Sequence, residues 1–271
     1  MEPYWDLIKR IIIESDLVLE ILDARLIELS RNSEVERLVS EVGRPIMFVV
    51  NKMDLVSKET MRKEIDKLRK EGDVVFLSSK RRSSDRILYA AIKKAFKKYG
   101  KRVKEYTEES PQYREAIGNI VVAIVGYPNV GKSSIINLLS HKKKVKVSKK
   151  SGTTHGVHWI RASEDIKLID SPGVIPLEKD DDVRYGLIGA RDSEAIKNPE
   201  LVAYSLIKFF IKKNKKAFEN FYKMEITKED PDVVLKNLAE KKSYFLKGGI
   251  LDENRACSTL IRDWQQGRLR L

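Results

Sequence analysis

Short apolar runs rich in β-branched residues recur through the first two thirds of the chain, separated by stretches with helical spacing. The runs fall in two series, at 17–24, 45–51 and 73–79 and then at 120–126, 156–162 and 166–173. Between two of them, Met61, Ile65 and Leu68 form an apolar stripe within a predicted helix at 57–71. Nearly continuous apolar strands that alternate with helices predict an α/β fold with a mostly parallel sheet covered on both faces.

The pattern changes twice along the chain. The polar stretch 100–118, which contains Gly and Pro, predicts a connector between the two series of strands. Beyond about residue 184 only helical patterns occur: apolar residues recur at helical spacing over 199–222, and Pro231 is placed to begin another helix. We therefore predict a sheet-bearing domain over 1–183 and a small all-α C-terminal domain over 184–271.

The composition narrows the class of protein. Hydrophobic residues make up 42% of the chain and charged residues 34%, as in soluble globular proteins. Cys257 is the single cysteine, so an internal disulfide is excluded. No apolar run approaches the roughly 20 residues of a membrane helix, and the N-terminus is unlike a secretory signal. We expect a monomeric cytoplasmic protein with no membrane partner.

The net charge of +13 is concentrated in clusters. Residues 93–104 hold seven basic residues and residues 141–150 hold six lysines, and neither segment contains an acidic residue. Residues 184–271 carry 18 Lys and Arg against 12 Asp and Glu. This distribution favours a polyanionic partner such as nucleic acid. The alternative is the Lys- and Glu-rich surface of a heat-adapted protein.

The stretch GYPNVGKS at 126–133 follows a predicted strand and begins a helix. In this setting the pattern G-x-x-x-x-G-K-[ST] predicts a phosphate-binding loop whose backbone N–H groups surround the phosphates. Lys132 would contact the β- and γ-phosphates and Ser133 would bind Mg²⁺. The residues of this loop expected to contact the nucleotide are Asn129, Val130, Gly131, Lys132, Ser133 and Ser134.

Two further motifs fall where Mg²⁺ and the γ-phosphate would be sensed. Asp170 of DSPG ends a predicted strand and would hold Mg²⁺ through water, and the Gly173 N–H would contact the γ-phosphate. The alternative is a strand-ending Asp before a Pro-Gly turn. In SGTT we choose Thr154 over Thr153 as a further Mg²⁺ ligand, because related loops place the ligand second. Lys132, Thr154 and Gly173 are thus the expected catalytic contacts.

A guanine-reading motif precedes the phosphate loop. Asn51, Lys52 and Asp54 match N-K-x-D directly after the predicted strand 45–51. The Asp54 carboxylate would accept hydrogen bonds from N1–H and the exocyclic amine of guanine, a pair that adenine does not offer. Lys52 would lie along the base. The alternative role for Asp54 is that of a helix cap.

The stretch SSK, formed by Ser78, Ser79 and Lys80, also ends a predicted strand. It matches the second base-reading loop of GTP-binding proteins, in which the Ser79 N–H would contact guanine O6. Both base-reading motifs lie at carboxyl ends of strands, where open α/β sheets bind ligands. The motif order is base, base, phosphate, switch and Mg²⁺, which predicts a circularly permuted P-loop GTPase sheet.

The motifs together, in this order, resemble the circularly permuted ribosome-assembly GTPases of the YlqF/YawG group. The resemblance covers nearly all 271 residues and includes DAR at 23–25, SRN at 30–32, NKMDL, GYPNVGKSS, GTT…W, DSPGV and the C-terminal GG…D…RA…L…DWQQGRL. It implies GTP and GDP as ligands, Mg²⁺ as cofactor, and GTP hydrolysis. It also implies ribosomal RNA or a ribosomal-subunit precursor as partner, and hence a GTP-hydrolysing switch in ribosome assembly, chiefly of the large subunit.

Catalysis is defined least by the sequence. Val174 follows Gly173, and since valine cannot orient a water we expect slow intrinsic turnover that ribosome or RNA stimulates. The same valine leaves open a GTP-gated interaction module with negligible hydrolysis. The first ten residues lack the histidine that the family often carries. His155 is either a catalytic candidate or a switch-loop or RNA-facing residue. Asn129 is either a K⁺ ligand, as in GTPases with a similar loop, or a loop-stabilising residue.

Overall fold

The computed structural model describes residues 4–100, 120–140, 158–171 and 182–271 of the chain. A six-stranded sheet runs through it in the order β3-β2-β1-β4-β6-β5. Its strands are β1 (Leu17–Asp23), β2 (Ile46–Asn51), β3 (Asp73–Phe76), β4 (Ile120–Val125), β5 (His158–Arg161) and β6 (Ile166–Asp170). All neighbouring strands pair in parallel except β5, which is antiparallel to β6. The predicted mostly parallel α/β sheet is therefore confirmed.

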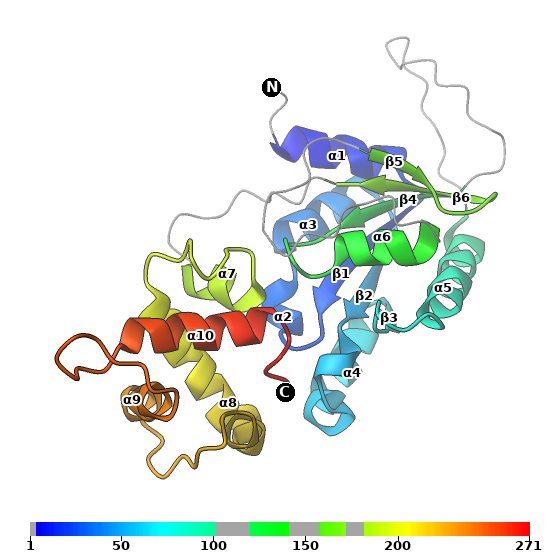
Figure 1. Cartoon of the computed structure of the whole chain (residues 1–271). Coiled ribbons are helices and arrows are strands. Elements are labelled where there is room, and N and C mark those ends of the chain that lie inside the picture. The colour runs from blue at the N-terminus through cyan, green and yellow to red at the C-terminus, as the bar shows by residue number, and fades with distance from the viewer. Residues whose placement is uncertain (1–3, 101–119, 141–157, 172–181) are drawn as a thin grey trace.

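Helices cover both faces of the sheet, which is why the central strands are apolar on both sides (Figure 1). Every residue of β1 and β4 is buried. One face packs against α1 (Tyr4–Glu14), α3 (Ser33–Val42) and α4 (Lys58–Glu71), and the other against α5 (Ser84–Tyr99) and α6 (Lys132–Ser140). The short helix α2 (Ile27–Ser30) follows β1.

The C-terminal helices are α7 (Asp182–Ile188), α8 (Pro199–Tyr222), α9 (Pro231–Lys241) and α10 (Glu253–Gln265). Their core is aromatic: Phe210 and Trp264 are fully buried, with ring centroids 5.6 Å apart at 90°. This apolar core is continuous with the α5/α6 side of the sheet. The predicted domain division at residues 183 and 184 falls inside α7, so the organisation into two domains stays a prediction.

Helix α8 spans the predicted range 199–222 but bends within it. Asn214 has non-helical backbone angles, φ −160° and ψ 73°, in the middle of the lysine run KKNKK. Its side-chain oxygen accepts a hydrogen bond from the Ala217 N–H at 3.1 Å. Asn214 therefore caps the second half of the helix, because a side-chain acceptor there satisfies an N–H group that the bend leaves without its helical partner.

The predicted connector 100–118 lies outside the described residues except for Gly100, which ends α5 with φ 79°. Among the helices of the described part of the chain, none is both long and apolar enough to cross a bilayer.

Candidate functional site

The carboxyl ends of the parallel strands converge at one edge of the sheet, where an open α/β sheet binds ligands. Asp23 at the end of β1 pairs in register with Asn51 at the end of β2. Asp170 at the end of β6 pairs with Ile124 of β4, two residues before Gly126 begins the phosphate loop. The structure therefore brings the strand-end residues of separate sequence motifs to a common edge.

The phosphate loop is built around glycines and a buried lysine. Gly131 has φ 109°, and a Cβ atom there would lie 2.2 Å from Nδ2 of Asn51, so only glycine fits. Lys132 is 8% exposed, and its Nζ donates to the carbonyls of Gly126 at 2.7 Å and Tyr127 at 2.8 Å. The amine thus points back into the loop, the place where a phosphate would lie.

Burial lowers the pKa of Lys132 to about 8, and the carboxylate of Asp170 opposes that shift. Asp170 is itself buried. Together with the Ser133 hydroxyl it offers the oxygen donors that Mg²⁺ prefers, and Mg²⁺ usually takes its remaining ligands from phosphate and water. Among the described residues no group of three or more His, Cys, Asp or Glu side chains could hold a metal. The predicted contacts of Thr154 and Gly173 lie outside the described residues.

Asn51 joins the phosphate loop to both base-reading loops. It is 1% exposed, its Nδ2 donates to the Val130 carbonyl at 3.1 Å, and its Oδ1 accepts the Ser79 N–H at 2.9 Å. Ser79 was predicted to donate the same N–H to guanine O6, so that contact would have to be shared with Asn51. The contacts of Asn51 and Ser79 with the nucleotide itself stay predictions.

Asp54 presents its carboxylate at the second base-reading loop. Oδ1 accepts the Ser78 hydroxyl at 2.7 Å and Oδ2 accepts Lys80 Nζ at 2.8 Å. Burial alone would raise the pKa of Asp54, but the hydrogen bonds from Lys80 and Ser78 hold that pKa below its ordinary value. Asp54 is therefore an ionised acceptor at neutral pH, as recognition of the guanine N1–H and amine requires.

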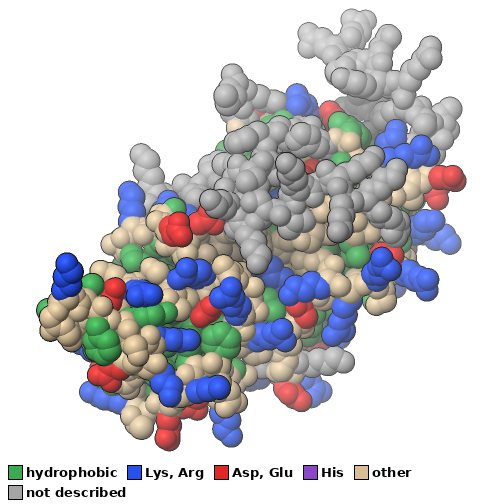
Figure 2. All heavy atoms as spheres, in the orientation of Figure 1, with side chains coloured by type: hydrophobic (Ala, Val, Ile, Leu, Met, Phe, Trp, Pro, Cys, Tyr) green, Lys and Arg blue, Asp and Glu red, His purple; other side chains and the backbone are tan. Residues whose placement is uncertain are grey.

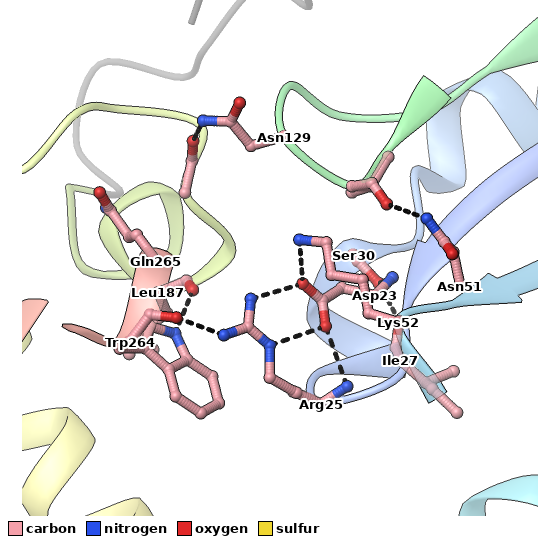
Figure 3. Close-up of polar contacts among 12 residues, drawn as sticks. Asp23, Arg25, Ile27, Ser30, Asn51, Lys52, Asn129, Leu187, Trp264 and Gln265 are labelled. Carbon is pink, nitrogen blue, oxygen red and sulfur yellow. Dashed lines mark hydrogen bonds and ion pairs between the residues drawn. The ribbon is translucent and has the colours of Figure 1, made fainter. Parts of the chain in front are cut away.

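Lys52 reaches a residue for which the sequence assigned no role. Its backbone is left-handed, with φ 65°, and its Nζ donates to Asp23 Oδ2 at 2.7 Å (Figure 3). Asp23 and Arg25 belong to the DAR stretch, and both are buried. The available signal was two charged residues, one ending an apolar strand and one two residues later, which predicts a paired buried charge.

The C-terminal helices also reach the site (Figure 3). In the turn after α7, the Gly189 carbonyl accepts Asn129 Nδ2 of the phosphate loop at 2.5 Å. In α10, Gln265 Nε2 donates to the carbonyls of Gly186 and Arg191, each at 2.9 Å. Asn129 therefore stabilises the position of the phosphate loop against this turn, whereas its predicted role as a K⁺ ligand stays a prediction.

Comparison with known proteins agrees with this geometry. Residues 121–238 match the family described as 50S ribosome-binding GTPase. The chain is 34% identical over 267 residues to an uncharacterized GTP-binding protein of Methanocaldococcus jannaschii, covering 98% of this chain and 66% of that protein. It is 26% identical over 256 residues to ribosome biogenesis GTPase A of Priestia megaterium, covering 92% of this chain and 84% of that protein.

The fold matches that of YlqF from T. maritima, solved with GNP bound, with a TM-score of 0.63 and 19% sequence identity over 99% of this chain and 96% of that one. By contrast, this chain spans between 47% and 66% of the length of the archaeal, fungal, plant and animal relatives that it matches.

Proposed function

We propose that this chain is a GTP-hydrolysing switch in ribosome assembly, acting on the large subunit. Its fold, motif order and sequence, which resemble those of the circularly permuted GTPases of the YlqF/YawG group, support the proposal. GTP and GDP are its ligands and Mg²⁺ its cofactor. We place its work in the cytoplasm, as a monomer, on ribosomal RNA or a subunit precursor.

The observation that carries this proposal is the contact of Asn51 with Val130 and Ser79. A single buried side chain connects the phosphate loop with both base-reading loops, although the base-reading motifs come first in the sequence. All three loops follow carboxyl ends of strands in one sheet. Circular permutation changes their order along the chain but leaves their arrangement in space unchanged. One nucleotide that carries both a guanine and a phosphate chain fits this arrangement.

Each part of the site has a role in the proposed reaction. Lys132 would exchange its carbonyl partners for the β- and γ-phosphates, where its charge stabilises the negative charge that develops during transfer. Asp170, Ser133 and Thr154 would hold Mg²⁺, which would supply positive charge against the phosphates, and the Gly173 N–H would contact the γ-phosphate. Val174, lacking a hydrogen-bonding group, supports slow turnover in the absence of a partner.

A change between the GTP-bound and GDP-bound states would be transmitted to the C-terminal helices. Helix α7 begins at Asp182, nine residues beyond Gly173, so a change at the γ-phosphate loop would act on a segment that leads directly into α7.

On the face shown in Figure 2, Lys and Arg side chains are spread over the surface of the protein together with fewer acidic ones. Their phosphate-pairing capacity supports RNA as partner.

Single-turnover hydrolysis of GTP, measured with and without purified ribosomal subunits, tests this proposal. Stimulation by large subunits supports a hydrolysing switch. Val174 also favours a second function, a GTP-gated interaction module: GTP-dependent subunit binding with no hydrolysis above the uncatalysed rate would select it. Stimulation by neither subunit, together with no nucleotide-dependent binding, would reject both functions.

A further inference from the structure

Among the side chains of the first base-reading loop, Lys52 is held by a residue outside the predicted site. Its partner Asp23 lies at the end of β1 with a side chain that is 0% exposed. An unpaired carboxylate at such a position would be very costly to bury. Burial by itself would raise the pKa of Asp23, but the positive charges of Arg25 and Lys52 hold that pKa well below its ordinary range. Asp23 is therefore a fixed anion against which Lys52 is positioned.

Arg25 in turn fixes the orientation of Asp23. Its Nε donates to Asp23 Oδ1 at 3.0 Å and its Nη2 to Oδ2 at 2.7 Å, and the Arg25 side chain is 1% exposed. Such a paired contact sets the plane of the carboxylate as well as its position. Lys52 Nζ and Arg25 Nη2 bind the same oxygen, so a shift of Arg25 would change the geometry offered to Lys52.

Arg25 is itself anchored to α10. Its Nη1 donates to the Trp264 carbonyl, and its guanidinium carbon lies 4.1 Å from the centroid of the Trp264 ring. The indole is fully buried and donates Nε1–H to the Leu187 carbonyl of α7 at 2.7 Å. The contacts run from Lys52 through Asp23 and Arg25 into two C-terminal helices (Figure 3).

The same loop meets the C-terminal segment at a second place. The Leu271 N–H donates to the Leu55 carbonyl at 2.8 Å, and the Ser57 N–H donates to the Leu271 carbonyl at 3.2 Å. Gly267 has φ 69°, and a Cβ there would lie 2.9 Å from the Leu55 side chain. Leu271 and Gly267 both lie in the segment that directly follows α10. The position of the base-reading loop therefore depends on where that helix ends.

We propose that Arg25 is a positioning residue for guanine-nucleotide binding, which acts through Asp23 on Lys52 and ties that lysine to Trp264 of α10. This inference rests on the proposed function only in taking Asn51–Asp54 as the guanine-reading loop. It requires no contact between Arg25 and the nucleotide. Its consequence is that the affinity for the base, shared by GDP and GTP, depends on the docking of the C-terminal helices.

The test uses Arg25→Lys, which keeps a cation opposite Asp23 but loses the paired contact. Arg31→Lys is the matched control. Arg31 also pairs with carboxylates, those of Glu36 at 2.7 Å and of Glu71, and lies over the Phe48 ring, and the described ion pairs of its guanidinium are with these residues and not with the base-reading loop. The dissociation constants of GDP and of a non-hydrolysable GTP analogue are measured by calorimetry. The free energy of unfolding in urea is measured on the same proteins without nucleotide.

We expect Arg25→Lys to weaken GDP and the GTP analogue alike, by about tenfold, the lower end of what losing a charge-assisted hydrogen bond produces. Arg31→Lys should leave both affinities unchanged whatever it does to stability. Combined with Lys52→Ala, Arg25→Lys should weaken binding no further than Lys52→Ala alone, because both act through one contact.

Wild-type GDP affinity in Arg25→Lys, or additive effects of Arg25→Lys and Lys52→Ala, would overturn the proposal. So would an Arg25→Lys protein that does not fold while Arg31→Lys does, since Arg25 would then be a purely structural residue. The affinity of the wild-type protein, measured in the same series, reports separately on whether the chain binds guanine nucleotides at all.

Discussion

Replacing Asn51 with alanine should weaken the fold and the nucleotide site together. The substitution removes two hydrogen bonds, from Nδ2 to the Val130 carbonyl and from the Ser79 N–H to Oδ1. A buried polar group left without a partner costs about 1–3 kcal/mol. The Val130 carbonyl contact is buried, whereas the Ser79 N–H contact is only partly buried and loses less. We therefore expect the free energy of unfolding to fall by about 2–4 kcal/mol, which a domain of ordinary stability, about 5–15 kcal/mol, survives.

The same change should reduce GDP affinity by at least about tenfold, because the phosphate loop and both base-reading loops lose their common anchor. Urea unfolding without nucleotide gives the stability, and calorimetric titration with GDP gives the affinity. Asn220→Ala, at an exposed position of α8, is the control and should stay within about 0.5 kcal/mol of wild type. An Asn51→Ala protein with wild-type stability and GDP affinity would refute the role assigned to this side chain.

Three further outcomes are expected. Asp54→Asn exchanges a pure acceptor for a mixed donor and acceptor, so GTP affinity should fall and xanthosine nucleotides should gain relative to GTP; unchanged GTP binding would contradict the assignment. The pKa of Lys132, about 8 without ligand, should rise when phosphates replace its carbonyl partners. GDP binding above about pH 8 should therefore take up protons, which calorimetry detects as a binding heat that depends on the buffer, and Lys132→Met should abolish this uptake. Single-turnover hydrolysis should be faster in K⁺ than in Na⁺ at equal ionic strength and lose that difference in Asn129→Ala; equal wild-type rates would exclude K⁺ as an activator.

The pH dependence of stability follows from the same lysine. Burial places the pKa of Lys132 in the folded, unliganded protein below the ordinary lysine value of 10.5. Between about pH 8 and 10.5 the unfolded state therefore binds more protons than the folded state, and the contribution of Lys132 to stability rises with pH. Lys132→Met should remove this rise in urea unfolding experiments, and an unchanged rise would assign it to other groups.

The sheet and its loops could be predicted because their signals are local. An apolar strand followed by GYPNVGKS or NKMDL fixes the neighbours of Lys132 and Asn51 within a few residues of sequence. Parallel pairing then places those loops at one edge whatever their order along the chain. The site could therefore be predicted from the permuted order of motifs as well as from the ordinary order.

The contacts of Arg25 could not be predicted in this way. Arg25 and Trp264 are 239 residues apart, and their contact exists only because the end of α10 lies beside the turn that follows β1. A charged residue after a strand signals a paired charge but does not identify the partner. The bond from Ser79 N–H to Asn51 was missed for a related reason: side chains that connect loops satisfy backbone groups that the sequence alone would assign to the ligand.

The central claim is that this protein is a GTP-dependent switch that acts on ribosomal RNA. It predicts that the affinity for the ribosome depends on whether GTP or GDP is bound. The most direct measurement is co-sedimentation of the protein with large ribosomal subunits in a non-hydrolysable GTP analogue and in GDP, across a series of salt concentrations. We predict tighter binding with the analogue than with GDP. The logarithm of the binding constant should fall with the logarithm of the salt concentration, with a slope of about −0.7 to −0.9 for each phosphate neutralised. Replacing Lys142, Lys143 and Lys144 with Glu should weaken binding to the subunit and leave nucleotide affinity unchanged. Equal binding in both nucleotides that is also insensitive to salt would contradict the account.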